Sequence, residues 1–460
     1  MSKGGSQTRR CFLDLGCGDV GLWHKQHGIH ETWKDHGMGL LLTLAKEQGY
    51  EFDVVALSAL HSWAEWRTIA KRYDLICMNV RSWRYVYAKR AAEIAKSANP
   101  NVQIWAGGMH ATVARHEMEE VEAFDVIVSR EAEGTFLELL ATGGSATRFV
   151  EGNCGKYTNL DDLPYIDREL WPKAPGDTWP LEGPGGWGPG PKAITTLTAR
   201  LCPWHCSFCF PAEKNHFGIP RRRSVGHVLG ELNYAHEKWG PATTVVYHDS
   251  EFLMHRAWLE EYLERYPRET PNWPWWGSCR ADMMAKWPDL VRALHREANW
   301  HCFSIGLESG SQKVLDIMNK ETTVAQNYAA IDLVNSLIDE AEREGRRPPV
   351  IFANIMLGTP GEEPEDAFAT IRMMSHMKRA IPSLSLYTPY PGNTLGDRMI
   401  AEGRSLDTHK TYHRFPNEAK LKGIDYGWYA RLFNGEYNRE CGLDVPAMMR
   451  QQGNAGEALT

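Results

Sequence analysis

The chain lacks any apolar run that approaches the roughly 18 residues needed to span a bilayer. Its polar start, Met1 to Arg10, also lacks the apolar block of a signal peptide. Basic residues cluster densely only at Arg221, Arg222 and Arg223, and the formal net charge is -7. We therefore expect a cytoplasmic protein with no membrane span and no nucleic-acid partner.

The composition gives no sign of disorder or of a fibrous repeat, since 43% of residues are apolar and 24% are charged. At 460 residues the chain exceeds the roughly 250–300 residues that one core usually serves, so we expect two or three domains. The ten cysteines do not indicate disulfides, because thiols stay reduced in the cytosol and clustered thiols there more often bind metal.

Residues 1–150 alternate short apolar runs with helical patterns. Helical spacing is found within residues 40–45 and 88–98. Buried strands are expected at residues 53–57, 74–78, 102–106 and 125–128. This order predicts an α/β domain, a doubly wound Rossmann-like fold that binds ligands at the carboxyl ends of its parallel strands.

Residues 151–192 break the alternation and are expected to form a linker, because they contain a Gly, Pro and Trp-rich stretch at 183–191. Residues 193–395 resume it and predict a partial (β/α)6 barrel of the TIM type. Its strands are expected at residues 193–198, 243–248, 275–279, 302–307, 350–357 and 384–388. Residues 396–460 form a C-terminal segment whose aromatic side chains either cover the barrel mouth or pack the segment onto the barrel; these are Tyr412, Phe415, Tyr426, Trp428 and Tyr429.

Residues that can carry chemistry follow the carboxyl ends of these barrel strands, where barrels of this type build their active sites. In strand order they are the cysteine loop, Asp249 with Glu251, Arg280, Glu308, residues 358–362 and residues 389–392. The clustering predicts one site at this edge. For any single carboxylate, a helix cap or a surface position is the simpler interpretation.

Cys202, Cys206 and Cys209 form a CxxxCxxC loop that can wrap three thiolates around one soft metal centre. No fourth cysteine lies nearby, although structural zinc sites and electron-transfer clusters normally use four ligands. His205 is the local candidate to close a zinc site, but the loop would have to turn sharply to deliver it. Three thiolates on an iron-sulfur cluster leave one iron open to a substrate.

The loop, with Phe208 before its last cysteine and a strand before its first, resembles the radical S-adenosylmethionine superfamily. The resemblance implies a [4Fe-4S] cluster on Cys202, Cys206 and Cys209. It also implies that S-adenosylmethionine binds the open iron through its amino and carboxylate groups and is cleaved to a 5'-deoxyadenosyl radical. A flavodoxin or ferredoxin is the expected reducing partner.

Further motifs extend this resemblance and imply contacts to S-adenosylmethionine. Asp249, Ser250 and Glu251 resemble the motif that contacts the amino group, and Arg280 is placed to neutralise the carboxylate. The remaining implied contacts are Glu308 and Ser309 to the ribose, Gly358 to the adenine, and Phe208 and Thr388 to the cofactor.

The N-terminal domain resembles the cobalamin-binding domain attached to one large radical subfamily. The segments that carry this likeness are residues 37–49, 107–112 and 130–135. Residues 161–164 resemble the linker that follows this domain in the subfamily, and residues 390–392 resemble a turn late in its barrel. The implied cobalamin contacts are Gly107, Gly108, His110 and Glu131. A plain tight turn is the alternative for the glycine pair.

One departure from many cobalamin proteins is the missing Asp-x-His-x-x-Gly motif, which supplies a histidine to cobalt. Asn79, Ser82 and Trp83, after the third strand, become the candidates for the cofactor's lower face. A domain that kept its shape but lost cobalamin would show the same departure. Residues 14–18 also suggest a conventional methyltransferase turn, but the second strand ends in residues 56–58 without the acidic residue that would hold a ribose.

The leading hypothesis is a cobalamin-dependent radical methyltransferase acting on an unactivated carbon of a small-molecule or natural-product substrate. Cobalamin would take a methyl group from one S-adenosylmethionine, and a second molecule would provide the radical. The alternative is an enzyme of the same subfamily that catalyses a rearrangement, cyclisation or oxidation without methylation. A non-catalytic iron or zinc scaffold is a third possibility.

Overall fold

The computed structural model describes residues 8–16, 34–171, 193–210, 218–412 and 419–445. The chain divides into two compact units. The first contains residues 1–180, 215–217 and 407–413, and the second contains residues 181–214, 218–406 and 414–460. None of the described helices is both long and apolar enough to cross a membrane.

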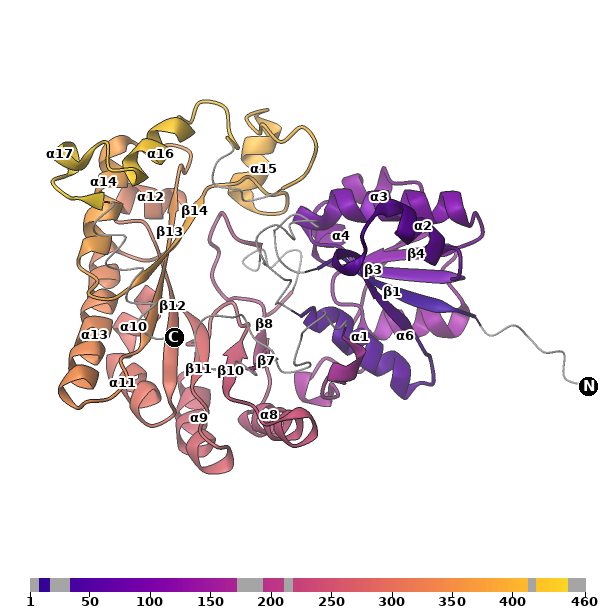
Figure 1. Cartoon of the computed structure of the whole chain (residues 1–460), viewed down its shortest axis with the longest axis horizontal. Helices are drawn as coiled ribbons and strands as arrows, with labels where there is room; N and C mark the ends of the chain where they lie inside the picture. Colours follow the sequence, from indigo (N-terminus) through magenta and orange to yellow (C-terminus); the bar gives the residue numbers. More distant parts are fainter. Residues whose placement is uncertain (1–7, 17–33, 172–192, 211–217, 413–418, 446–460) are drawn as a thin grey trace, which may run out of the picture. The chain divides into compact units, whose positions relative to one another are not determined.

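The first unit is built on a six-stranded parallel sheet with the order β2-β1-β3-β4-β5-β6 (Figure 1). Its strands are β1 (Arg10–Asp14), β2 (Asp53–Ala56), β3 (Leu75–Asn79), β4 (Gln103–Gly107), β5 (Val126–Ser129) and β6 (Phe149–Glu151). Its helices are α1 (His36–Glu47), α2 (Trp63–Ala70), α3 (Tyr85–Ala98), α4 (Met109–Val113), α5 (Arg115–Glu119) and α6 (Glu133–Thr142). One apolar cluster joins the sheet to α2 and α3, and another joins it to α1 and α6. The predicted doubly wound fold is confirmed.

Residues 157–171, which we expected in a linker, add apolar side chains to the α1 and α6 cluster of the first unit. Trp171 is fully buried, and its indole Nε1 donates to the Asp35 carbonyl over 2.9 Å. Gly39 leaves the room for this ring, since a Cβ there would lie 2.4 Å from the same Nε1. The segment has no helical or strand period, so its sequence pattern does not reveal this packing.

The second unit holds a six-stranded parallel sheet with the order β14-β13-β12-β11-β10-β7. Its strands are β7 (Ala193–Thr196), β10 (Thr244–Tyr247), β11 (Trp275–Arg280), β12 (Trp300–Glu308), β13 (Val350–Leu357) and β14 (Ile381–Leu386). A short antiparallel pair, β8 (Ala199–Arg200) and β9 (Arg221–Arg222), follows β7. Each of the six predicted strands overlaps an observed one, and β7 and β14 form opposite edges of the sheet. The predicted partial barrel is confirmed.

Helices cover this second sheet, and further helices follow in the C-terminal part (Figure 1). They are α8 (Val225–Trp239), α9 (Arg256–Glu269), α10 (Ala281–Lys286), α11 (Pro288–Arg296), α12 (Gln312–Ile317), α13 (Val324–Arg343), α14 (Pro364–Ser375), α15 (Thr394–Ala401), α16 (Tyr426–Phe433) and α17 (Asn438–Cys441). Ser224 caps α8, and Thr323 forms a capping box on α13, which explains where these two helices begin.

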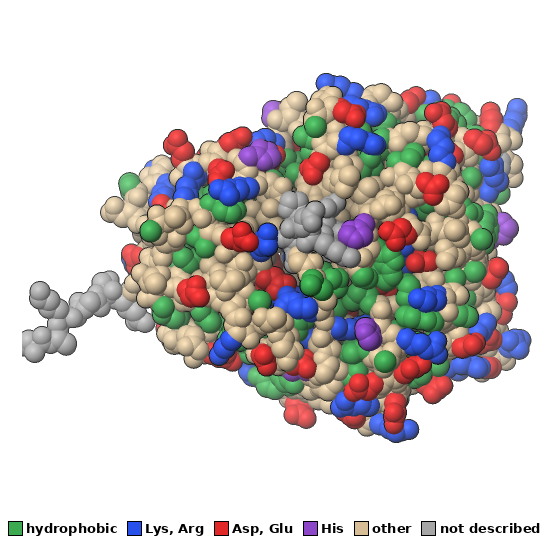
Figure 2. Space-filling view, turned by 180° about the vertical axis from the view of Figure 1, so that it is seen from behind, with side chains coloured by type: hydrophobic (Ala, Val, Ile, Leu, Met, Phe, Trp, Pro, Cys, Tyr) green, Lys and Arg blue, Asp and Glu red, His purple; other side chains and the backbone are tan. Residues whose placement is uncertain are grey.

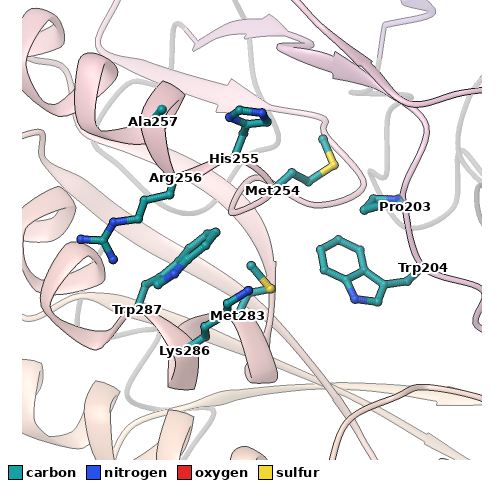
Figure 3. A pocket seen from close by; sticks show the side chains of 9 residues that line it. All are labelled: Pro203, Trp204, Met254, His255, Arg256, Ala257, Met283, Lys286 and Trp287. Atoms are coloured by element: carbon teal, nitrogen blue, oxygen red, sulfur yellow. The ribbon is translucent and has the colours of Figure 1, made fainter.

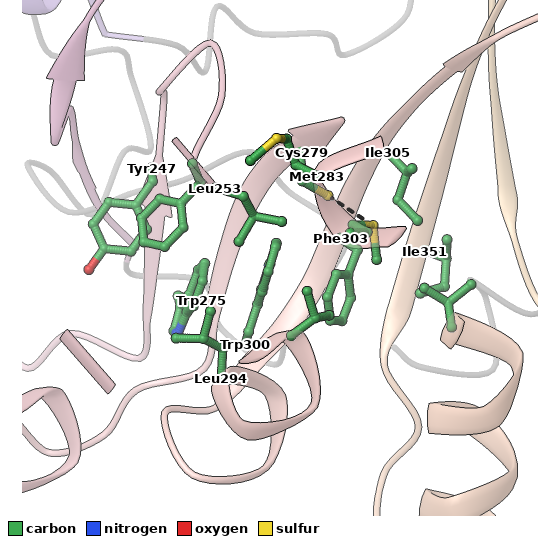
Figure 4. Packing of buried hydrophobic residues seen from close by; sticks show 14 of the residues in the cluster. Tyr247, Leu253, Trp275, Cys279, Met283, Leu294, Trp300, Phe303, Ile305 and Ile351 are labelled. Carbon is green, nitrogen blue, oxygen red and sulfur yellow. Dashed lines mark hydrogen bonds between the residues drawn. The ribbon is translucent and has the colours of Figure 1, made fainter. Parts of the chain in front are cut away.

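Aromatic side chains pack against one another in the core of the second unit (Figure 4). The rings of Trp275 and Trp300 stack with centroids 4.8 Å apart, and Phe303 lies 4.3 Å from Trp300. All three side chains are fully buried. This core lies between the sheet and its helices, so it fixes the strands whose ends carry the site.

Charged side chains of both signs are interspersed over the face of the molecule shown in Figure 2. Among the residues coloured there, acidic and basic groups lie side by side rather than in separate fields.

Candidate active site

The cysteine loop is held by backbone groups from distant parts of the second unit. The Ser207 amide donates to the Met318 carbonyl over 2.8 Å, and the Ser207 carbonyl accepts from the Leu395 amide over 2.8 Å. The Asn319 side-chain amide donates to the His205 carbonyl over 2.7 Å. The loop is therefore fixed from the C-terminal end of α12 and from the start of α15.

The three cysteines differ in exposure, since Cys206 is buried and Cys202 and Cys209 are partly exposed. Burial raises the pKa of the Cys202 thiol to about 11 and that of Cys209 to about 12. Metal binding must therefore displace protons from these thiols. The described residues contain no group of three or more His, Cys, Asp or Glu side chains arranged for a single metal ion. The thiols of a cluster bind different irons and need not meet at one point.

Arg280, at the end of β11, lies against the cysteine loop. Its Nη1 donates to the Cys206 sulfur over 3.3 Å, its Nε donates to Asp282 over 2.8 Å, and its Nη2 donates to the Thr322 hydroxyl over 2.9 Å. Its Cζ is 4.6 Å from the ring centroid of Trp204. We predicted Arg280 as a partner for a ligand carboxylate, and this stays a prediction; in the structure the buried guanidinium contacts the Cys206 thiol and neighbouring loops.

Asp249 lies inside the protein and fastens the start of the cysteine loop. Its carboxylate accepts from the Thr198 amide (2.8 Å), the Ala199 amide (2.7 Å) and the Thr198 hydroxyl (2.7 Å). Burial raises its pKa. With three of its acceptor positions used internally, Asp249 positions the loop; its predicted contact with an amino group stays a prediction.

Glu251 is also fully buried and links two strand ends. It accepts from the Leu253 amide over 2.7 Å and from the Arg280 amide over 2.6 Å. Burial raises its pKa to about 7. Ser250, between these two carboxylates, is exposed. Of this predicted motif, Ser250 is therefore the side chain that faces outward.

Glu308, at the end of β12, pairs with a buried lysine that the sequence analysis missed. Lys320 is 4% exposed, and its Nζ donates to Glu308 over 2.8 Å and lies 5.9 Å from the ring centroid of Phe208. An irregularity in strand register between Gly306 and Glu308 turns this carboxylate toward the lysine. A lone lysine between two helices carries no sequence signal of burial.

The remaining predicted residues of this unit lie at the ends of β12, β13 and β14. Ser309 is fully buried, and its hydroxyl lies 3.1 Å from that of Thr370 on α14, so it is engaged internally. Gly358 has a left-handed φ of 74°, which favours glycine. The Thr388 hydroxyl lies 3.4 Å from the Leu386 carbonyl.

Glu362 connects the loop after β13 to α16. Its Oε2 accepts from the Gly358 and Thr359 amides and, over 3.0 Å, from the Tyr429 hydroxyl. Burial raises its pKa to about 7, and these hydrogen bonds oppose that rise. Tyr426 lies within 4 Å of a Cβ built at Gly358, so aromatic residues of α16 border this turn.

In the first unit, Asp35, Asn79 and Gly108 interlock at the carboxyl edge of the sheet. The Asn79 amide nitrogen donates to both carboxylate oxygens of Asp35, over 3.0 and 2.8 Å, and Asp35 also caps α1. Gly108 has φ of 98°, and a Cβ there would lie 2.0 Å from the Asn79 Oδ1. We predicted that Gly107 and Gly108 form an opening for a cofactor, and this stays a prediction. The close packing against Asn79 by itself explains why position 108 requires glycine.

His110 and Ser82 lie in the interior, because both side chains are fully buried. The His110 Nδ1 is 3.1 Å from the Ser82 hydroxyl, and its Nε2 is 3.2 Å from the carboxylate of Glu117, which accepts from the Tyr412 hydroxyl over 2.6 Å. Burial lowers the pKa of His110. Burial also opposes the ionisation of Glu117, but the His110 and Tyr412 hydrogen bonds outweigh it and lower its pKa. The pair is a neutral imidazole beside a carboxylate.

Trp83 and Glu131 remain the partly exposed candidates at this edge, where Arg81 lies 6.0 Å from the Trp83 ring centroid. A flat, partly exposed aromatic surface beside a parallel-sheet edge suits a large planar cofactor such as a corrin. Residues 17 and 18 of the rival methyltransferase turn lie outside the described residues.

Family models match both units separately. The B12 binding domain matches residues 29–140, and the Radical SAM superfamily matches residues 196–374. The solved structure of the cobalamin-dependent S-adenosylmethionine radical enzyme OxsB, with aqua-cobalamin and S-adenosylmethionine bound, covers 98% of this chain and 66% of its own, with 16% identity and a TM-score of 0.60. This likeness supports the same fold.

Curated relatives align over most of the chain. An uncharacterised methyltransferase of Pyrococcus horikoshii is 25% identical over 87% of this chain and 86% of its own length. A bacteriochlorophyllide d C-12(1)-methyltransferase of Chlorobaculum tepidum is 24% identical over 76% of this chain and 72% of its own.

A different activity is named for a third relative, the anaerobic magnesium-protoporphyrin IX monomethyl ester cyclase of Cereibacter sphaeroides. It is 24% identical over 83% of this chain, which spans 63% of the cyclase's length. The two family models account for the three-thiol loop of the second unit and for the doubly wound first unit. The chain is a radical S-adenosylmethionine enzyme of the group that carries a B12-binding domain, with a [4Fe-4S] cluster, S-adenosylmethionine and cobalamin as its cofactors.

Proposed function

We propose that this enzyme is a cobalamin-dependent methyltransferase that acts on an unactivated carbon of a small-molecule or natural-product substrate. The observation that carries the proposal is that one chain combines a B12-binding unit with a loop of three cysteines. No fourth cysteine lies near this loop, so one iron of a cluster bound there would be open to S-adenosylmethionine. When bound, the three cofactors supply a hydrogen-abstracting radical and a transferable methyl group.

The residues of the second unit would serve this chemistry by binding the cluster and by positioning the cysteine loop. Cys202, Cys206 and Cys209 would bind the cluster, and the Arg280 guanidinium against the Cys206 sulfur would stabilise negative charge on that thiolate. Asp249 fixes the start of the loop through backbone amides.

In the first unit, Trp83 and Glu131 are the residues we propose to face cobalamin, with Gly107 and Gly108 shaping the edge beside them. His110 is withheld from cobalt by its burial and by its contacts with Ser82 and Glu117. We therefore propose that no histidine of the described residues binds the metal from below. Electron paramagnetic resonance of the bound cob(II)alamin tests this, because an axial nitrogen splits each cobalt line into three.

The test of the methyltransferase proposal is a product analysis on anaerobically reconstituted enzyme with dithionite and candidate substrates. Methylation should produce S-adenosylhomocysteine together with 5'-deoxyadenosine. The similarity to the cyclase favours a second candidate, a reaction without methyl transfer. Formation of 5'-deoxyadenosine alone, with substrate consumed, would decide for that second candidate.

A further inference from the structure

An open groove lies beside the cysteine loop, at the carboxyl ends of β7, β10 and β11 (Figure 3). It has a volume of about 490 Å³. The residues that line it, here called the Trp204 groove, are Pro203, Trp204, Met254, His255, Arg256, Ala257, Met283, Lys286 and Trp287. None of the predicted cofactor contacts is among them.

The Trp204 groove combines an apolar lining with basic side chains. Trp204, Met254, Met283 and Trp287 supply most of its surface, and Figure 3 shows these side chains arranged around the groove. His255, Arg256 and Lys286 are the titratable groups among its nine residues, none of which is acidic. The chain as a whole has a net charge of -7, whereas the side chains that line this groove are basic or neutral.

Neighbouring acidic groups reduce this positive charge only in part. Arg256 on α9 pairs with Glu260 over 2.8 Å, and Asp282 on α10 is committed to Arg280. Lys286 lies 5.1 Å from the ring centroid of Trp287, which leaves its ammonium beside an aromatic face of the groove. An acidic partner would therefore meet favourable charge at the edge and apolar contacts at the centre.

Trp204 connects the groove to the cluster-binding loop. Its ring lines the groove, and its centroid is 4.6 Å from the Arg280 Cζ. The Arg280 Nη1 is in turn 3.3 Å from the Cys206 sulfur. A carrier seated in the groove would thus be separated from a cluster ligand by one indole and one guanidinium in direct contact.

We propose that the Trp204 groove is the docking site of an acidic one-electron carrier protein that reduces the cluster from the Cys206 side. The step transfers one electron, so the carrier is oxidised by one electron and the cluster is reduced by one, with no bond made. The inference rests on the proposed function, because the cluster must be reduced in each turnover. Methionine and tryptophan suit a protein partner, since they adapt to its surface and bury large areas.

The test uses the full-length reconstituted enzyme and purified flavodoxin as the probe. Arg256→Glu with Lys286→Glu should lower the second-order rate of cluster reduction by reduced flavodoxin at least about tenfold at low salt. The rate is followed by loss of cluster absorbance, and binding of oxidised flavodoxin is measured by calorimetry. Reduction by dithionite, which needs no docking, should be unchanged in the variant.

A matched control reverses two basic residues elsewhere in the same unit, Arg268→Glu with Arg343→Glu. Both are exposed and lie at the C-terminal ends of α9 and α13, and Arg268 is about 18 Å along α9 from Arg256. If the groove variant and this control have equal flavodoxin rates and affinities, the docking proposal is wrong. It is also wrong if the groove variant binds the small-molecule substrate more weakly while its flavodoxin rate and affinity are unchanged. Failure of dithionite to yield 5'-deoxyadenosine in the wild type overturns the proposed function instead, and flavodoxin calorimetry still decides the docking.

Discussion

The two units place their candidate ligand-binding residues at the same edge of a parallel sheet, but they fix that edge differently. In the second unit, charged side chains are bound to the backbone, as Asp249 is to the Thr198 and Ala199 amides. In the first unit, close packing sets the shape, as Gly108 does against Asn79. The comparison teaches that a residue in a ligand-binding motif can act by positioning the residues around the ligand.

The strongest test of the second unit removes the thiols themselves. Replacing Cys202, Cys206 and Cys209 by Ala should abolish both iron binding and 5'-deoxyadenosine formation, because no other described cysteine belongs to this loop. Iron content and product analysis measure the two losses. Cys154→Ala, a partly exposed thiol of the first unit, is the control and should keep its iron. A triple variant that still holds about four irons would refute the cluster assignment.

A steric change tests the first unit. Gly108→Ala should destabilise that unit by about 2–4 kcal/mol, since it combines a left-handed φ with a Cβ only 2.0 Å from Asn79. Denaturant unfolding and cobalamin retention report the effect, and iron content should not change.

Two variants separate strain from collision at Gly108. Gly49→Ala has a similar positive φ of 81° with no atom within 4 Å of its Cβ, so it should cost only about 1 kcal/mol. Adding Asn79→Ala to Gly108→Ala removes the nearest atom, while the Val80 backbone nitrogen stays 2.9 Å from the new Cβ, so we expect only a partial rescue. If Gly49→Ala and Gly108→Ala destabilise equally, packing is not what selects glycine at position 108.

A polar change tests the positioning role of Asp249. Asp249→Asn should weaken the hold on the start of the cysteine loop by about 1–3 kcal/mol, because the amide nitrogen cannot accept a hydrogen bond. We expect lower iron content together with weaker S-adenosylmethionine binding. Ser250→Ala, the exposed neighbour, is the control for direct contact. Weaker S-adenosylmethionine binding in Asp249→Asn with full iron and unchanged stability would instead support a direct contact to the ligand.

The smallest expected effect is the pH dependence that Glu362 gives to the second unit. Burial raises the pKa of Glu362 from 4.5 to about 7 in the folded state, so the folded protein keeps a proton that the unfolded chain releases. Stability should therefore fall as pH rises from about 4.5 to 7, by at most about 3 kcal/mol.

Glu362→Gln removes this titration while keeping an oxygen that can accept from Tyr429. Thermal unfolding between pH 5 and 8 should show the variant gaining stability relative to the wild type as pH rises. Asp366→Asn, at a carboxyl whose pKa is lowered from 3.8, should show no pH trend relative to the wild type over this range, because Asp366 is ionised in both the folded and the unfolded protein there. Parallel curves for Glu362→Gln and the wild type would contradict a shifted Glu362.

The sequence predicted the strands, and which residues follow their carboxyl ends, because both depend on short-range patterns. Apolar runs ending in Asp249, Arg280 or Glu308 mark strand ends, and parallel strands bring such ends together. The contacts were not predictable in this way. Lys320 reaches Glu308 through a register irregularity, and Arg280 reaches Cys206 through tertiary packing, neither of which has a sequence period.

The boundary of the first unit was hidden for a related reason. Trp171 joins the first unit with its indole beside Gly39, and Tyr412 joins it with its hydroxyl on Glu117 and its ring beside His110. Isolated side chains in irregular segments look like linker in a sequence, whatever they pack against. Sequence patterns therefore predict the sheet and its helices well, but they do not predict which irregular segments pack onto them.

The Tyr412–Glu117 contact also has a consequence for the order in which the protein is made. The first unit includes residues 407–413, so its buried His110–Glu117 pair gains the Tyr412 hydroxyl only after the whole second sheet has been translated. At ordinary elongation rates this is about 10–50 s after Trp171 is added. During that interval the nascent first unit holds a buried carboxylate without one of its donors, so its maturation ends with the last part of the chain.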